Sequence, residues 1–146
     1  MPSLVYNSFM RDIATGQVDC DTDTFKMMLV TSSYVASKSH DRRDDIKSPT
    51  DYEVTGAGYT AGGNACALTV AATDNVNNDV EISFSVTSWT SATITARGGV
   101  IYKSRGGASS ADELVGYVDF LSNITSTNGT FAVTVSTPLS LTNPNP

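Results

Sequence analysis

Residues Asp79–Thr87 alternate strictly between apolar and polar side chains, and this pattern limits the fold more than any other part of the chain. Val80, Ile82, Phe84 and Val86 fall on one side of an extended segment, and polar residues fall on the other. This period of two is typical of a strand with one buried and one solvated face. It predicts an antiparallel sheet that packs on a core with one side only.

Several other segments have the composition of strands, and short polar turns separate most of them. The turn signals are strong at 74–79, which is rich in Asn and Asp, and at Asn128-Gly129. The remaining strand candidates are Phe25–Thr31, Cys66–Ala72, Ala92–Ala96, Gly99–Lys103, Leu114–Phe120 and Thr130–Thr137. No helical pattern lies between them, so a mainly all-β fold is expected, as an antiparallel β-sandwich of jelly-roll or Ig-like type.

The N-terminal segment 3–15 is the one convincing helix. Val5, Phe9 and Ile13 recur at helical spacing, Ser3 can cap the start and Gly16 suits the left-handed residue after the end. We expect a single β-sandwich domain over residues 1–137 that includes this helix. Residues 138–146 hold three prolines and are expected to form an extended tail that cannot continue a strand.

The connection from Ala36 to Tyr52 is polar, dense in charge and unusually long for a compact domain. Unstructured loops of more than about 12–15 residues are uncommon and often functional. A short helical turn within Asp41–Lys47, anchored by Ile46, is the expected local structure.

The charge balance argues against nucleic-acid binding. The chain of 146 residues carries a net charge of −6, and its nine basic residues are scattered, whereas sequence-independent DNA binding needs clustered Lys and Arg. No apolar stretch approaches the length of a membrane span or a signal peptide, so a protein made and assembled in a cytoplasm is expected. Cys20 and Cys66 are then expected to be free thiols, although the sequence leaves their pairing open.

The chain offers no catalytic constellation. Asp19–Asp23 begins like an EF-hand loop, but its sixth and twelfth positions hold the wrong residues. His40 stands alone in a polar loop, which is a weak basis for a metal site or a catalytic triad. The four glycines of 56–63 lead into a strand, so they indicate a tight chain reversal and not a phosphate loop. We therefore expect no enzyme activity, no cofactor and no metal.

Two further motifs have ordinary structural interpretations. The Arg97-Gly98-Gly99 and Arg105-Gly106-Gly107 segments look like RNA-binding units, but those units work as repeats in disordered tails, whereas these segments flank a strand. Trp89 lies between strand patterns and is expected to pack in the core or at a sheet edge.

The order of the motifs resembles a family of small virion structural proteins of tailed phages, of the kind found as capsid cement or decoration proteins. The resemblance covers about residues 5–135. Its motifs are Val5–Phe9, Gly16–Asp19, Asp21–Lys26, Leu29–Tyr34, His40-Asp41, Glu53–Gly56, Gly58–Gly63, Trp89 and Val100–Lys103. The proline-containing tail departs from the shorter ends expected of the family.

The resemblance implies a non-enzymatic β-sandwich that assembles as a dimer or trimer on the outer surface of the capsid. Its partners would be the major capsid protein and copies of itself, with neither nucleic acid nor membrane involved, and its location would be the virion. On this basis Arg42, Arg43, Asp44 and Asp45 are predicted to lie near a protein partner.

Two other functions make different predictions. A neck, tail or fibre component that binds a receptor or glycan would use Trp89 or a tyrosine such as Tyr59 as a contact. A small hydrolase would lose its activity when His40 is replaced.

Overall fold

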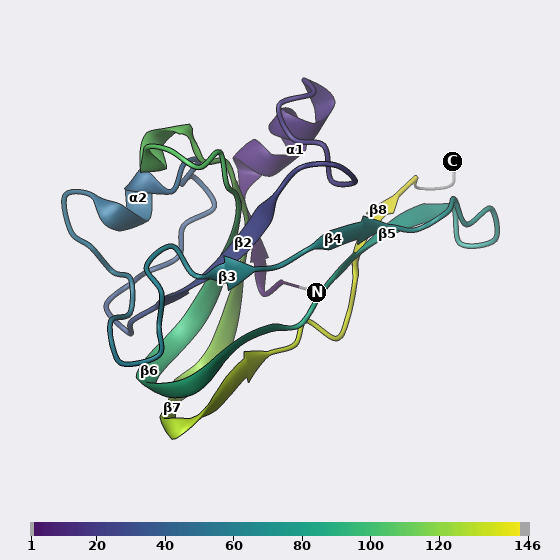
Figure 1. Ribbon diagram of the computed structural model, residues 1–146. Coiled ribbons are helices and arrows are strands. Elements are labelled where there is room, and N and C mark those ends of the chain that lie inside the picture. Colours follow the sequence, from purple (N-terminus) through teal and green to yellow (C-terminus); the bar gives the residue numbers. More distant parts are fainter. Residues whose placement is uncertain (1, 144–146) are drawn as a thin grey trace.

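The computed structural model describes residues 2–143, which form short helices and antiparallel strands (Figure 1). The helices are α1 (Asn7–Ala14), α2 (Asp44–Lys47) and the 3-10 turn η1 (Ser109–Ala111). The strands are β1 (Leu4–Val5), β2 (Phe25–Val30), β3 (Asn64–Ala65), β4 (Leu68–Val70), β5 (Asp79–Phe84), β6 (Thr87–Lys103), β7 (Leu114–Val133) and β8 (Leu139–Thr142).

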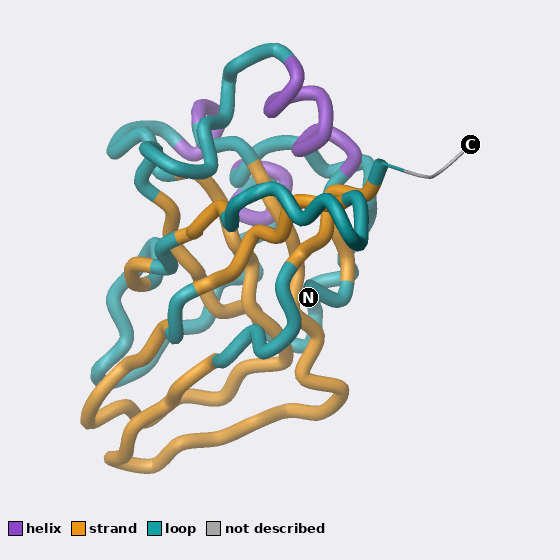
Figure 2. The backbone as a smooth tube through the Cα atoms, turned by 90° about the vertical axis from the view of Figure 1, so that its right-hand side faces the viewer, coloured by secondary structure: helices purple, strands orange, loops and turns teal. Residues whose placement is uncertain are grey.

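Within the described residues the strands form two antiparallel sheets. The larger has the order β1-β7-β6-β2-β3, and the smaller has the order β4-β5-β8. The expected mainly β, sandwich-like fold with a short N-terminal helix is therefore confirmed. The helices gather at one end of the molecule, and the long strands extend toward the other (Figure 2).

One long ribbon joins the two sheets. β5 runs almost directly into β6, and β7 runs into β8, so the β5–β8 pair continues the β6–β7 pair. Figure 1 shows β6 and β7 bending together at the lower left before they climb toward the helices. The register shifts by bulges along this pair, which increases bending and twist. Because of this bend, one continuous pair of strands contributes β6 and β7 to the larger sheet and β5 and β8 to the smaller sheet.

The position of β2 explains why Met27–Val30 is apolar without interruption. Phe25, Met27 and Leu29 belong to the core between the two sheets, whereas Met28 and Val30 belong to a second core on the opposite face. A strand that is buried on both faces needs apolar residues at every position. The larger sheet is thus covered on both sides.

The second core is closed by the long connection after β2. Ile46 in α2 is fully buried there, together with Tyr34 and Tyr6. The expected short helical turn with Ile46 as its anchor is confirmed. Residues 31–63 are therefore packed on the larger sheet through their own apolar side chains.

The N-terminal helix is shorter than expected. Leu4 and Val5 pair with Tyr117 and Gly116 of β7, so α1 begins only at Asn7. The hydroxyl of Ser3 does not cap the helix, because it accepts a hydrogen bond from the N–H of Asp119 at 2.9 Å. Sheet pairing has replaced the first helical turn. Gly16 does adopt the expected left-handed conformation, with φ of 69°.

The alternating pattern of Asp79–Thr87 fails at its end. Ile82 and Phe84 are buried as expected, but Val86 is 57% exposed and Thr87 is buried. The chain leaves β5 after Phe84 and enters β6 at Thr87, and this change of sheet inverts the two faces. A periodicity argument assumes one continuous strand, which the molecule does not have here.

Two further expectations are wrong. Asn128 is left-handed with φ of 47°, yet the chain does not reverse at Asn128-Gly129, because these residues form an irregularity within β7 opposite Ala92 and Thr93 of β6. After Thr137 the chain does form a strand, since Leu139–Thr142 pairs with β5 as β8. Of the expected tail, residues 144–146 lie outside the described residues.

Candidate interaction surface

Two of the four predicted partner-contact residues hold the long connection to the body. The Arg42 guanidinium lies 3.1 Å from the buried Asp12 carboxylate of α1. The Arg43 guanidinium lies 2.7 Å from the buried Asp112 carboxylate, and its Cζ stands 5.0 Å from the centre of the Tyr102 ring. Breaking either pair would leave a buried carboxylate without its partner, which is costly. Both arginines therefore stabilise the fold through ion pairs. Their contact with a protein partner stays a prediction.

The other two predicted residues begin α2. Asp44 is half-buried and Asp45 is exposed, and the Asp45 carboxylate accepts the N–H of Asp41 at 2.8 Å. Two carboxylates in the first turn suit the positive end of a helix. Asp45 is the member of the predicted set that offers the most surface to a partner.

The sequence analysis missed Glu53, which organises the glycine-rich segment. Its buried carboxylate accepts hydrogen bonds from Lys47 Nζ and the Tyr59 hydroxyl, each at 2.7 Å, and from the N–H of Gly62. Burial, followed by the charge of Glu53, raises the pKa of Tyr59 well above its usual range. No motif surrounds Glu53, so only the folded structure identifies it.

A shallow polar hollow of about 320 Å³ lies beside this network. Four of its five charged side chains pair with one another, because Arg43 pairs with Asp112 and Lys47 pairs with Glu53. Burial, only partly opposed by the nearby Arg43 charge, raises the pKa of Tyr102 to about 12. The charges in the hollow are therefore mostly compensated, and Lys26 is the lining cation that has no ion pair among the described residues.

His40 belongs to a short hydrogen-bonded chain of aromatic residues. Its Nδ1 lies 3.0 Å from the Tyr34 hydroxyl, which in turn lies 2.8 Å from the hydroxyl of Tyr6. Among residues 2–143 no group of His, Cys, Asp and Glu is arranged to hold a metal ion. The Asp19–Asp23 segment forms a turn, in which the N–H of Asp19 donates a hydrogen bond to the Asp23 carboxylate at 2.7 Å.

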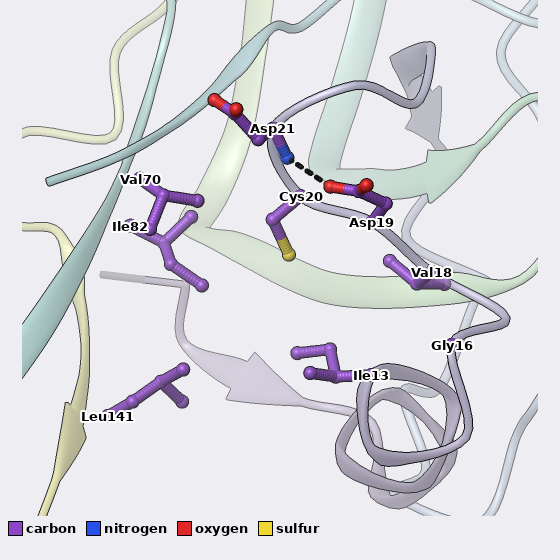
Figure 3. A pocket seen from close by; sticks show the side chains of 9 residues that line it. All are labelled: Ile13, Gly16, Val18, Asp19, Cys20, Asp21, Val70, Ile82 and Leu141. Carbon is purple, nitrogen blue, oxygen red and sulfur yellow. Dashed lines mark hydrogen bonds between the residues drawn. The ribbon is translucent and has the colours of Figure 1, made fainter.

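An open, mainly apolar groove of about 640 Å³ is present on the described surface. It lies between the end of α1, the 18–21 turn and the β4-β5-β8 sheet, and Figure 3 shows Ile13, Val18, Ile82 and Leu141 around it. Burial, followed by the charges of Asp19 and Asp23, raises the pKa of Cys20 to about 11. The thiol is therefore protonated at neutral pH and acts as a packing group.

The arginines of the two Arg-Gly-Gly segments are engaged by carboxylates. Arg97 pairs with Asp119, and Arg105 pairs with Glu113 at 2.6 Å. Gly98 leaves room for the ring of Tyr117, which a Cβ would overlap at 2.4 Å. These contacts agree with the structural interpretation of the two Arg-Gly-Gly segments.

Trp89 is a core residue, as the sequence analysis expected. It is 1% exposed and lies between Tyr59 and Phe131, with ring centroids 5.7 and 6.2 Å away. Its indole ring has no face available to a sugar. The glycan contact expected of Trp89 in a tail or fibre protein is therefore absent from this fold.

The outer edge of β7 is the most distinctive surface for association. Its inner edge pairs with β6, whereas its outer edge pairs with β1 only at Gly116 and Tyr117. Within residues 2–143 no strand lies against the outer edge from Ile124 to Val133. Leu121 lies in the irregular part of β7 between Asp119 and Ile124 and is 83% exposed with φ of 66°, and Ile124 is 43% exposed.

Comparison with known proteins identifies no relative. No family model, curated protein or solved structure matches the chain. Among the described residues, no helix combines the length and apolar character that crossing a membrane requires.

Proposed function

We propose that this chain is a non-enzymatic structural protein of a tailed-phage virion. It binds the outer surface of the capsid as a cement or decoration protein and bridges neighbouring capsomers of the major capsid protein. The resemblance in motif order suggests this role. The fold supports this role in two ways. Ion pairs hold the long connection to the β-sheet body, and exposed apolar side chains offer surfaces for association.

The observation that carries the proposal is the position of the exposed apolar side chains. Val35 is 79% exposed after β2, Val76 is 88% exposed in the β4–β5 turn and Leu121 is 83% exposed in β7. The connection after β2 and the β4–β5 turn lie on opposite sides of the molecule in Figure 1. A body that joins two neighbouring subunits needs contacts at more than one end.

The buried ion pairs make such a body stiff. Arg42 joins the long connection to Asp12 of α1, and Arg43 joins it to Asp112, close to the start of β7. A force on the connection is therefore transmitted to the rest of the fold. A DNA-filled head presses outward on its capsomers. An interface of about 1,000 Å² for each copy is modest alone, but many copies on one lattice act together.

The proposal is tested with virions made with and without this chain. Wild-type particles are expected to contain many copies in a fixed ratio to the major capsid protein, measured by quantitative mass spectrometry. Particles without the chain are expected to release DNA at lower temperature, and adding the purified protein should restore them. A double variant, Val76→Ser with Leu121→Ser, should restore them less well than Thr90→Ser, a control at an exposed polar position. A few copies confined to the neck or tail would contradict the proposal.

A further inference from the structure

The outer edge of β7 lacks the devices that usually protect a strand edge. No Asp, Glu, Lys or Arg follows Asp119 in the chain, and no proline occurs within β7. Monomeric proteins commonly block such edges with charges, prolines, bulges or covering segments. Beyond the segment that β1 covers, β7 has only its irregularities near Leu121 and Asn128. They leave the stretch Ile124–Thr127 between them, of which Ile124–Ser126 keeps a regular register with β6.

The charge distribution indicates what this edge pairs with. Two copies of a chain with a net charge of −6 repel each other over most of their surfaces. The stretch Ile124–Thr127 consists of Ile, Thr and Ser only, so two copies meet there without bringing like charges together. Leu121 and Ile124 add exposed apolar surface beside the same stretch.

We propose that Ile124–Thr127 of β7 pairs with the same stretch of a second copy and forms a two-fold dimer with a continuous sheet. When one edge binds itself, the two copies are related by a two-fold axis, and across this axis the strands run antiparallel. The open N–H and C=O groups of each copy then satisfy those of the other. This inference does not depend on the capsid role, because the purified chain alone should dimerise.

Sedimentation equilibrium of purified variants tests the dimer. Thr127 and Thr90 are both exposed threonines on strands, but Thr127 lies on the open edge and Thr90 lies on β6. We expect Thr127→Lys to raise the dimer dissociation constant by about tenfold or more, because a lysine on a strand edge disfavours pairing with another chain. Thr90→Lys should leave the constant within about twofold. Since both changes reduce the net negative charge equally, only the position of the lysine distinguishes them.

Disulfide trapping tests the surface independently. Single cysteines are introduced at Ile124, Thr125, Ser126 and Thr127, with Thr90→Cys as the control. Oxidation by oxygen and a copper catalyst should give a covalent dimer most rapidly at one of the four edge positions and slowly at Thr90. The inference is overturned if the wild-type chain stays monomeric at about 100 μM. It is also overturned if a dimer forms that Thr127→Lys does not weaken, or if the edge cysteines cross-link no faster than the control.

Discussion

Replacement of Gly63 by alanine should destabilise the fold strongly, because two separate costs meet at this residue. Its φ is 72°, and a Cβ there would lie 1.8 Å from the carbonyl oxygen of Met27. Left-handed backbone costs a non-glycine residue about 1–2 kcal/mol. The overlap is with the backbone of β2, a strand buried on both faces, so relief requires a shift that costs about 1–3 kcal/mol more. We expect Gly63→Ala to lower the free energy of unfolding by about 3 kcal/mol.

Substitutions at Gly16 and Gly107 allow the backbone cost to be measured separately from the cost of steric overlap. Gly16 has φ of 69° with no atom near its Cβ position, so Gly16→Ala carries only the backbone cost of about 1–2 kcal/mol. Gly107 has neither a positive φ nor a neighbour, so Gly107→Ala should be neutral or stabilising by up to about 1 kcal/mol.

The assay is equilibrium unfolding in urea, followed by the fluorescence of Trp89. This residue is the only tryptophan of the chain and is buried between Tyr59 and Phe131. The reasoning would be refuted if Gly63→Ala unfolded at the same urea concentration as Gly16→Ala. That result would show that the glycine-rich segment does not press on β2 as described.

Three further predictions concern buried groups. Burial raises the pKa of Cys20 to about 11 and also raises that of Cys66, so Ellman's reagent at pH 8 should modify both thiols rapidly only after unfolding. Burial opposes the ionisation of Glu113, but the hydrogen bonds and charge of Arg105 outweigh it and lower the Glu113 pKa below its ordinary 4.5. The stability that this pair contributes is therefore fully present above the ordinary pKa and is lost as the pH falls through the lowered pKa of Glu113. Glu113→Gln should make the free energy of unfolding fall less steeply at acid pH. Ile46→Ala should cost about 2–5 kcal/mol in thermal or urea unfolding, because Ile46 anchors the long connection in the second core.

Local patterns in the sequence predict much of the fold. The apolar run at Phe25–Thr31 and the alternation from Asp79 to Phe84 depend on near neighbours, and the structure places strands there. Ile46 is a single apolar residue in a polar segment, and such an isolated side chain is expected to be buried. These features are decided by which side chains must leave water.

Features that depend on distant parts of the chain could not be predicted. Leu4 and Val5 fit a helix stripe equally well, and only the available edge of β7 makes them a strand. Leu139–Thr142 becomes β8 because β5 offers it a partner, although the flanking prolines argue for a tail. Glu53 could not be predicted for a different reason. Its partners Lys47, Tyr59 and Gly62 lie within nine residues of it, but no sequence pattern indicates that they converge.

The proposed role requires the chain to occupy the outer capsid lattice of a virion and to contact neighbouring capsomers. Electron microscopy of intact particles, with averaging over the capsid lattice, should show this fold at every equivalent position on the outer surface, in contact with at least two capsomers. Lattice density that lacks the fold, or copies found only at the neck, tail or fibres, would contradict the proposed role.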